Sequence, residues 1–223
     1  MIKKIYQFLY YLFSNKHERG EQNSGYFQGL IRRKVAQLCG LERGRVLEIG
    51  QGAGLLLEKL SKGNPCLKLY GIDKSLELSI RAIKRLESAN CRNFSILLAD
   101  AYKTVFKEAI FDKVICINFI INIDSLAGIK ELLREMKYVC SPQGSIILEF
   151  RNSRNLLFLL KYKCAAFYDG TLNGLTANCY RLEDIEAVLN SLNLKIIRQE
   201  TLGMPFCKKL APIIIMEAKK YDF

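Results

Sequence analysis

Short apolar runs alternate with longer amphipathic stretches along most of the chain. The short runs, rich in β-branched residues, predict strands at residues 45–50, 67–73, 94–100, 145–150, 194–201 and 212–218, and one that begins within 111–123. Apolar residues spaced three and four apart predict helices at residues 53–62, 75–88, 125–140 and 182–193. Strands that alternate with helices are typical of a mostly parallel sheet covered by helices on both faces.

The last two predicted strands have no room for a helix between them. Only about ten residues, among them Gly203 and Pro205, separate strand 194–201 from strand 212–218. Because a parallel crossover needs a dozen or more residues, we expect these two strands to be antiparallel neighbours.

Residues 1–45 differ from the rest of the chain in charge and aromatic content. They hold nine Lys and Arg but only three Glu, which is half of the formal net charge of +12. We therefore expect a basic, aromatic N-terminal helical arm at 1–45 and a domain at 46–223. The apolar helix predicted within residues 1–13 either packs on the domain, makes a peripheral contact with anionic lipid, or covers an apolar substrate.

The composition is that of a folded protein. Half of the residues are apolar and a quarter are charged, which excludes a disordered chain. No apolar run approaches the ~18–20 residues of a membrane span. The eight cysteines lack zinc-ligand spacing and the single histidine is His17, so we expect no metal site and no His-dependent catalysis. Because a disulfide scaffold is not expected at this size, we predict a reducing, cytoplasmic location.

A glycine-rich loop follows the first predicted strand. Residues 48–54 read Glu-Ile-Gly-Gln-Gly-Ala-Gly. The third glycine is out of register for the dinucleotide pattern GxGxxG, and the GK[ST] of a phosphate-binding P-loop is absent. A carboxylate at Glu48, beside the loop, favours a cationic ligand over a pyrophosphate. S-adenosylmethionine fits this site, because it carries a sulfonium and an α-ammonium group and no phosphate.

Two further acids lie at the ends of the next two predicted strands. Asp73 ends strand 67–73, and Asp100 ends strand 94–100. The carboxyl ends of parallel strands share one edge of a sheet, which is where ligands bind in this class of fold. There Asp73 could accept hydrogen bonds from both ribose hydroxyls, and Asp100 could accept one from the adenine amine. We therefore expect a nucleoside site.

With these residues the sequence resembles the class I S-adenosylmethionine-dependent methyltransferases, of the type 11 kind related to quinone-biosynthesis methyltransferases. The resemblance covers residues 44–150 and, more loosely, 176–220. It implies a Rossmann-like three-layer α/β sandwich with a seven-stranded, mostly parallel sheet whose last strand is antiparallel. It also implies that Asn118 faces the methionyl part of the donor and that Tyr26 lies near the donor carboxylate. The expected cofactor-binding residues are Glu48, Gly50, Gln51, Gly52, Gly54, Asp73, Lys74, Asp100, Ala101 and Asn118.

Two departures from the motifs of related methyltransferases narrow the range of expected acceptor groups. After the predicted fourth strand, residues 118–121 read Asn-Phe-Ile-Ile in place of [DN]PP[YF]. Amino groups of adenine or glutamine are therefore not expected as acceptors. No Pro-Cys pair follows that strand, so a cytosine-C5 mechanism is not expected either.

Methyl transfer from a sulfonium needs mainly orientation, which can supply on the order of 7–11 kcal/mol. The sequence names no catalytic residue. Several polar residues lie at the ends of the later strands and in the insert 151–181, where they could contact an acceptor or act as a general base. They are Asn122, Asp124, Glu149, Arg151 and Tyr168.

The insert 151–181 is the main sequence clue to the acceptor. It is expected to form a substrate lid, and its apolar stretch 156–168 is flanked by Arg151, Arg154 and Arg181. It favours a small-molecule or lipid-linked acceptor with a negative group, although ordinary lid packing explains it too. Nucleic acid is not favoured as a partner, because no RNA-binding motif is present. An RNA methyltransferase and a non-catalytic S-adenosylmethionine-binding protein remain the alternatives, with an NAD oxidoreductase behind them.

Overall fold

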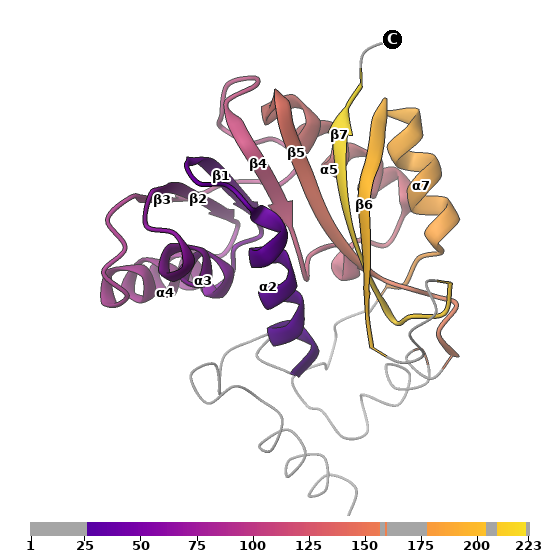
Figure 1. Ribbon diagram of the computed structural model, residues 1–223, viewed down its shortest axis with the longest axis horizontal. Helices are drawn as coiled ribbons and strands as arrows, with labels where there is room; N and C mark the ends of the chain where they lie inside the picture. Colours follow the sequence, from indigo (N-terminus) through magenta and orange to yellow (C-terminus); the bar gives the residue numbers. More distant parts are fainter. Residues whose placement is uncertain (1–25, 157–158, 160–177, 204–208, 222–223) are drawn as a thin grey trace, which may run out of the picture.

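The structure is a computed structural model that describes residues 26–156, 159, 178–203 and 209–221 (Figure 1). The apolar helix predicted within 1–13, most of the insert 151–181 and the candidate Tyr168 lie outside the described residues. In the described part of the chain, no helix is long and apolar enough to cross a membrane.

The described strands form one seven-stranded sheet with the order β3-β2-β1-β4-β5-β7-β6. The strands are β1 (Gly44–Ile49), β2 (Leu67–Asp73), β3 (Phe94–Leu98), β4 (Phe111–Cys116), β5 (Cys140–Arg151), β6 (Leu194–Leu202) and β7 (Ile213–Lys220). Only β7 runs antiparallel to its neighbours β5 and β6. The predicted fold class and the antiparallel pairing of the last two strands are therefore confirmed.

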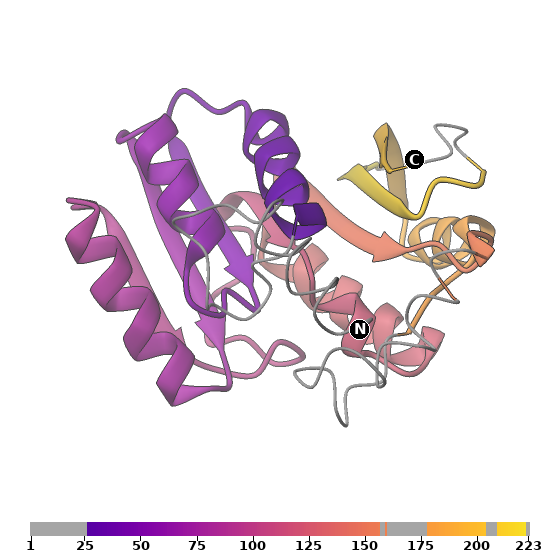
Figure 2. The same ribbon diagram turned by 90° about the horizontal axis from the view of Figure 1, so that it is seen from below.

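Helices cover both faces of this sheet (Figures 1 and 2). They are α2 (Tyr26–Cys39), α3 (Leu55–Gly63), α4 (Leu76–Ser88), α5 (Leu126–Val139) and α7 (Leu182–Ser191), with a 3-10 turn η2 (Ile120–Asn122). Alternate residues of β1, β4 and β5 pack into two separate cores, one beneath α2 and α3 and one beneath α5 and α7. This is the three-layer arrangement expected from strands that are apolar on both faces.

Serine caps explain where two helices begin. Ser75 Oγ accepts a hydrogen bond from Leu78 N at the start of α4, and Ser125 Oγ accepts one from Gly128 N at the start of α5. These bonds satisfy amide groups that have no partner within the helix.

The helix α2 lies inside the region predicted as an arm, yet it packs on the sheet. Ile31 and Val35 are fully buried against core residues of β1 and β4. The boundary between an arm at 1–45 and a domain at 46–223 stays a prediction.

Several strand boundaries differ from the predictions by one or two residues, and β3 ends at Leu98, so Asp100 follows that strand. Two larger differences concern β5 and β4. Strand β5 begins at Cys140, because Cys140 pairs with Phe111 before the register shifts and Ser145 pairs with Lys113. Strand β4 ends at Cys116, because Asn118 takes a left-handed backbone with φ 54° and η2 follows it. That early end of β4 opens the sheet edge on which the candidate site is built.

Candidate functional site

The glycine loop after β1 has a left-handed backbone at all three glycines. The φ angles of Gly50, Gly52 and Gly54 are 73°, 51° and 75°. Gly50 N and Gln51 N donate to Ile72 O at 2.8 and 3.2 Å, so the loop is fixed to β2. Such φ angles cost glycine little, whereas other residues are strained there.

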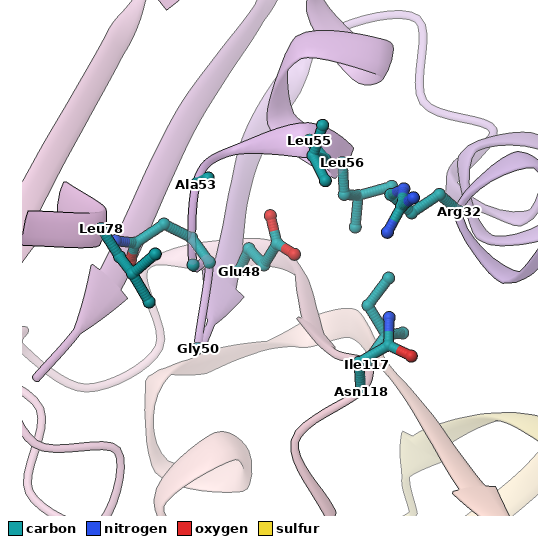
Figure 3. A pocket seen from close by; sticks show the side chains of 11 residues that line it. Arg32, Glu48, Gly50, Ala53, Leu55, Leu56, Leu78, Ile117 and Asn118 are labelled. Carbon is teal, nitrogen blue, oxygen red and sulfur yellow. The ribbon is translucent and has the colours of Figure 1, made fainter. Parts of the chain in front are cut away.

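The loop forms one wall of a pocket at the carboxyl edge of the sheet (Figure 3). The pocket encloses about 470 Å³, including the space at its open mouth. Its lining residues are Arg32, Glu48, Gly50, Gln51, Gly52, Ala53, Leu55, Leu56, Leu78, Ile117 and Asn118. Five of the predicted cofactor-binding residues thus meet in one cavity.

Glu48 and Arg32 are the two charged residues among those that line this pocket. Glu48 comes from β1 and Arg32 from α2, and their side chains enter from opposite sides (Figure 3). Both residues are buried, with 3% and 2% of their surface exposed. Glu48 Oε2 has no hydrogen-bond partner among the described residues.

Burial raises the pKa of the Glu48 carboxyl well above its ordinary value. The positive charge of Arg32 opposes this rise in pKa, and the negative charge of Asp73 adds to it. A buried carboxylate with an unsatisfied oxygen costs free energy, so its presence in a pocket indicates a binding role.

Asp73 braces the glycine loop from the end of β2. Its Oδ2 accepts a hydrogen bond from Gly52 N at 3.0 Å, and its Oδ1 accepts one from Ser75 N at 2.9 Å. Asp73 lies directly beside the pocket, although it is not part of the lining.

Asp100 lies one strand further, in the turn after β3. Its Oδ1 accepts a hydrogen bond from Tyr102 N at 2.9 Å, and its Oδ2 pairs with Lys74 Nζ at 3.0 Å. The hydrogen bond from Tyr102 N and the Lys74 ammonium together lower the pKa of the Asp100 carboxyl. Because β1, β2 and β3 are adjacent, Glu48, Asp73 and Asp100 come to one edge of the sheet, with Lys74 at the outer rim.

Two other predicted residues have packing roles instead of lining the pocket. A Cβ at Gly54 would lie 3.0 Å from the Cβ of Ala82, so this glycine allows α3 and α4 to approach. Ala101 is 5% exposed and belongs to the core beneath α5.

Asn118 is held by a buried ion pair from β5. Asn118 N donates to Glu149 Oε2 at 2.9 Å, and Arg151 Nη2 donates to Asn118 Oδ1 at 3.0 Å. Arg151 also pairs with Glu149. Of the other residues considered for the acceptor, Asn122 and Asp124 are exposed.

Arg32 is the charged pocket residue that the sequence analysis missed. In α2 it lies within the helical stripe formed by Ile31, Val35 and Cys39, which are buried. A single arginine in an otherwise apolar helical stripe is the signal that could have identified it.

Comparisons with known proteins agree with this geometry. Residues 46–144 match a family model described as a methyltransferase domain. A tRNA (guanine-N(7)-)-methyltransferase of Mycoplasmopsis agalactiae is 37% identical over 174 residues, which cover 77% of this chain and 73% of that protein. The chain belongs to the class I S-adenosylmethionine-dependent methyltransferases. A tRNA (guanine-N(7)-)-methyltransferase of Macrococcus caseolyticus matches over a shorter stretch, with 29% identity over 70 residues and 33% of its length.

Solved structures show the same methyltransferase fold. The magnesium protoporphyrin IX methyltransferase of Synechocystis, with bound S-adenosylhomocysteine, superposes with a TM-score of 0.69 at 19% identity and covers 99% of this chain and 100% of that one. The PH0226 protein of Pyrococcus horikoshii has a TM-score of 0.71 at 19% identity, over 97% of this chain and 99% of that one. With the family match and the relatives named above, the protein is an enzyme that uses S-adenosylmethionine as its methyl donor. The glycine loop and the buried Glu48 carboxylate fit a cationic donor of this kind.

Proposed function

We propose that the donor binds in the pocket at the carboxyl end of β1, and that Glu48, Asp73 and Asp100 set its orientation. Glu48 faces the cationic methionyl end, the backbone of Gly50 and Gly52 lies against the donor, and Asp73 accepts hydrogen bonds from the ribose. Asp100 lies near the adenine. The observation that carries this placement is the buried Glu48 carboxylate in the lining of a pocket bounded by left-handed glycines, with Oε2 lacking a hydrogen-bond partner among the described residues.

Arg32 completes the recognition of the methionyl group. The α-amino-acid part of that group carries one positive and one negative charge, and the described pocket lining carries one carboxylate and one guanidinium. Glu48 would bind the α-ammonium, and Arg32 would bind the α-carboxylate. Charge-assisted hydrogen bonds of this kind are about twice as strong as neutral ones.

Two nucleoside ligands test this placement by calorimetry. S-adenosylhomocysteine has the amino-acid group, and 5′-methylthioadenosine lacks it. We expect Arg32→Met to weaken S-adenosylhomocysteine binding by about tenfold or more, the effect of losing a hydrogen bond to a charged group, and to leave methylthioadenosine binding within about threefold. The control is Arg33→Met, because Arg33 is the exposed neighbour on α2. Equal losses for both ligands would contradict the role of Arg32.

Methyl transfer from a sulfonium requires mainly that the protein align the acceptor with the methyl group. When bound, S-adenosylmethionine supplies a methyl group on a sulfonium, so an acceptor lone pair can take that methyl in one in-line step. The residues around the pocket would orient the reactants and keep water out, which is the main catalytic contribution expected. Glu149 and Arg151, which are 1% and 2% exposed and paired with each other, are engaged with Asn118. They are poor candidates for a general base.

We propose RNA as the acceptor, with guanine N7 as the first atom to test. The name of the relative at 37% identity and the formal net charge of +12 support this acceptor. Guanine N7 has a lone pair and no proton, so its methylation needs no base. The small-molecule or lipid-linked acceptor suggested by the sequence rests on residues 151–181, most of which lie outside the described residues. It becomes the competing outcome of the experiment.

Transfer of a labelled methyl group decides between these acceptors. Unmodified tRNA transcripts, total lipids and a small-metabolite extract are incubated separately with the protein and labelled donor. We expect label in tRNA, released as 7-methylguanosine after digestion and mass spectrometry. Label in the lipid or metabolite fraction alone would overturn the RNA proposal. Donor binding without transfer to any fraction would favour a non-catalytic binding protein.

A further inference from the structure

The loop that follows β4 lines the donor pocket at Asn118 and is bonded further along to the segment before α7. Asn118 lines the pocket, and its neighbour Phe119 packs against the glycine loop. A Cβ at Gly50 would lie 2.4 Å from Phe119 Cδ2, so the ring is as close to this backbone as a glycine permits. The position of the Asn118–Phe119 segment therefore determines the shape of the pocket wall.

The same loop is bonded to the segment that returns to the sheet before α7. Asn178 N donates to Ile121 O at 2.8 Å, and the Tyr180 hydroxyl donates to Ile123 O. Tyr180 N donates to Arg151 O at 2.8 Å. Residues of β5, the loop after β4 and the Asn178–Tyr180 segment thus form one hydrogen-bonded unit beside the donor pocket.

Glu149 and Arg151 bind both the backbone and the side chain of Asn118. Glu149 Oε2 accepts from Asn118 N at 2.9 Å, while Arg151 Nη2 donates to Asn118 Oδ1 at 3.0 Å. These two bonds hold a non-glycine residue in a left-handed turn with φ 54°. Asparagine is one of the few residues that adopt this backbone at modest cost.

A buried ion pair contributes little to the net stability of a folded protein. Removing two charges from water costs several kcal/mol per ion, so apolar residues often stabilise a core as well or better. Glu149 and Arg151 are almost fully buried beside the pocket, and each forms a hydrogen bond with a residue that lines it. Their arrangement is explained by the position of Asn118 better than by stability.

We propose that Glu149 and Arg151 are positioning residues for methyl transfer, which fix the Asn118–Phe119 turn and so set the shape of the donor pocket. This inference rests on the donor placement proposed above. Neither residue needs to touch donor or acceptor, because both act through Asn118.

The chain contains a matched control for the effect on stability. Lys113 Nζ pairs with Glu217 Oε1 at 2.7 Å, and their side chains are 8% and 7% exposed. This second buried pair joins β4 to β7 near the amino end of β4, away from the pocket. Lys113→Met should lower the unfolding temperature and leave the affinity for S-adenosylhomocysteine unchanged.

The test measures S-adenosylhomocysteine affinity and unfolding temperature in Arg151→Met, Arg151→Lys, Asn118→Gly and their combinations. Arg151→Lys keeps a charge beside Glu149 but lacks the second nitrogen that reaches Asn118. We expect it to recover most of the unfolding temperature lost in Arg151→Met and still to bind about threefold to tenfold more weakly than the wild type, the effect of one lost hydrogen bond. Should Arg151→Met fail to fold, Arg151→Lys alone carries the test.

The decisive result is whether substitutions at Arg151 and Asn118 have additive effects on affinity. If Arg151 acts through Asn118, Arg151→Lys causes no further loss of affinity in the Asn118→Gly background. Additive losses, or wild-type affinity in Arg151→Lys, would overturn the inference. A wild-type protein that binds no S-adenosylhomocysteine would instead overturn the donor placement, so the two failures are distinguishable.

Discussion

At the scale of single residues, Glu48 shows how a binding site can cost stability. Its carboxyl is buried, one of its oxygens lacks a partner among the described residues, and burial raises its pKa well above the ordinary 4.5. A folded-state pKa above the unfolded value means that stability is highest below the ordinary pKa and is lost as pH rises through the folded-state pKa. At pH values above the ordinary pKa, Glu48 therefore destabilises the ligand-free protein.

Glu48→Gln should separate stability from donor binding. The neutral amide avoids the cost of a buried charge, so we expect a higher unfolding temperature at neutral and alkaline pH, measured by calorimetry. We also expect S-adenosylhomocysteine affinity to fall by about tenfold or more, since a charged hydrogen-bond partner is lost.

The pH dependence of binding gives a second measurement on this variant. Wild-type affinity should decline as pH falls through the raised pKa of Glu48, because the protonated carboxyl no longer attracts a cation. The affinity of Glu48→Gln should change little over the same range. Glu87→Gln, at an exposed position of α4, serves as the control. An unchanged affinity in Glu48→Gln would exclude Glu48 from donor recognition.

At the scale of elements, the site depends on how closely the loops after β1 and β4 approach. Gly50 supplies both a left-handed turn and the space for Phe119, whereas Gly52 has φ 51° with no atom within 4 Å of where a Cβ would lie. Gly63, at the end of α3, has open space and no left-handed φ. A side chain would thus meet both backbone strain and a steric contact at Gly50, backbone strain alone at Gly52, and neither at Gly63.

The stability lost on substitution by alanine should therefore decrease from Gly50 to Gly52 to Gly63. We expect Gly50→Ala to destabilise the protein by about 2–4 kcal/mol, from backbone strain and the clash with Phe119 together. Gly52→Ala should cost about 1–2 kcal/mol, from strain alone. Gly63→Ala should be neutral or slightly stabilising, since glycine in a helix is less favourable than alanine by about 0.5–1 kcal/mol. Chemical denaturation measures all three, and equal costs at positions 50 and 52 would argue against the Phe119 contact.

At the scale of the whole molecule, the donor pocket joins parts of the chain that are far apart in sequence. Its lining comes from α2, β1, the glycine loop, α3, α4 and the loop after β4. A ligand that contacts these elements stabilises the folded state by mass action, because the unfolded chain has no such site.

S-adenosylhomocysteine should therefore raise the unfolding temperature of the whole protein in one transition. At about 100 times its Kd the stabilisation is about 2.7 kcal/mol. For a chain of this size that corresponds to roughly 5–10 °C. Scanning calorimetry with and without ligand measures the shift, with NAD as the control ligand. No shift at a saturating concentration would argue against binding in this pocket.

Features that depend on neighbouring residues could be predicted from the amino-acid sequence. Alternation of apolar runs specified the strands and helices, and Ser75 and Ser125 marked two helix starts, because a cap acts over one helical turn. The loop 48–54 and the acids Asp73 and Asp100 pointed to the donor edge, because parallel strands bring their carboxyl ends to one side of a sheet.

Contacts between side chains that are distant in sequence became visible in the folded structure. Nothing local in the sequence pairs Asn118 with Glu149 or Arg151, which are 31 and 33 residues away along the chain. Arg32 lines the same pocket as Glu48 because α2 packs on the sheet, and β5 begins early because its register against β4 shifts. Such contacts depend on how helices and strands pack against one another, so periodicity and turn chemistry within one segment do not specify them.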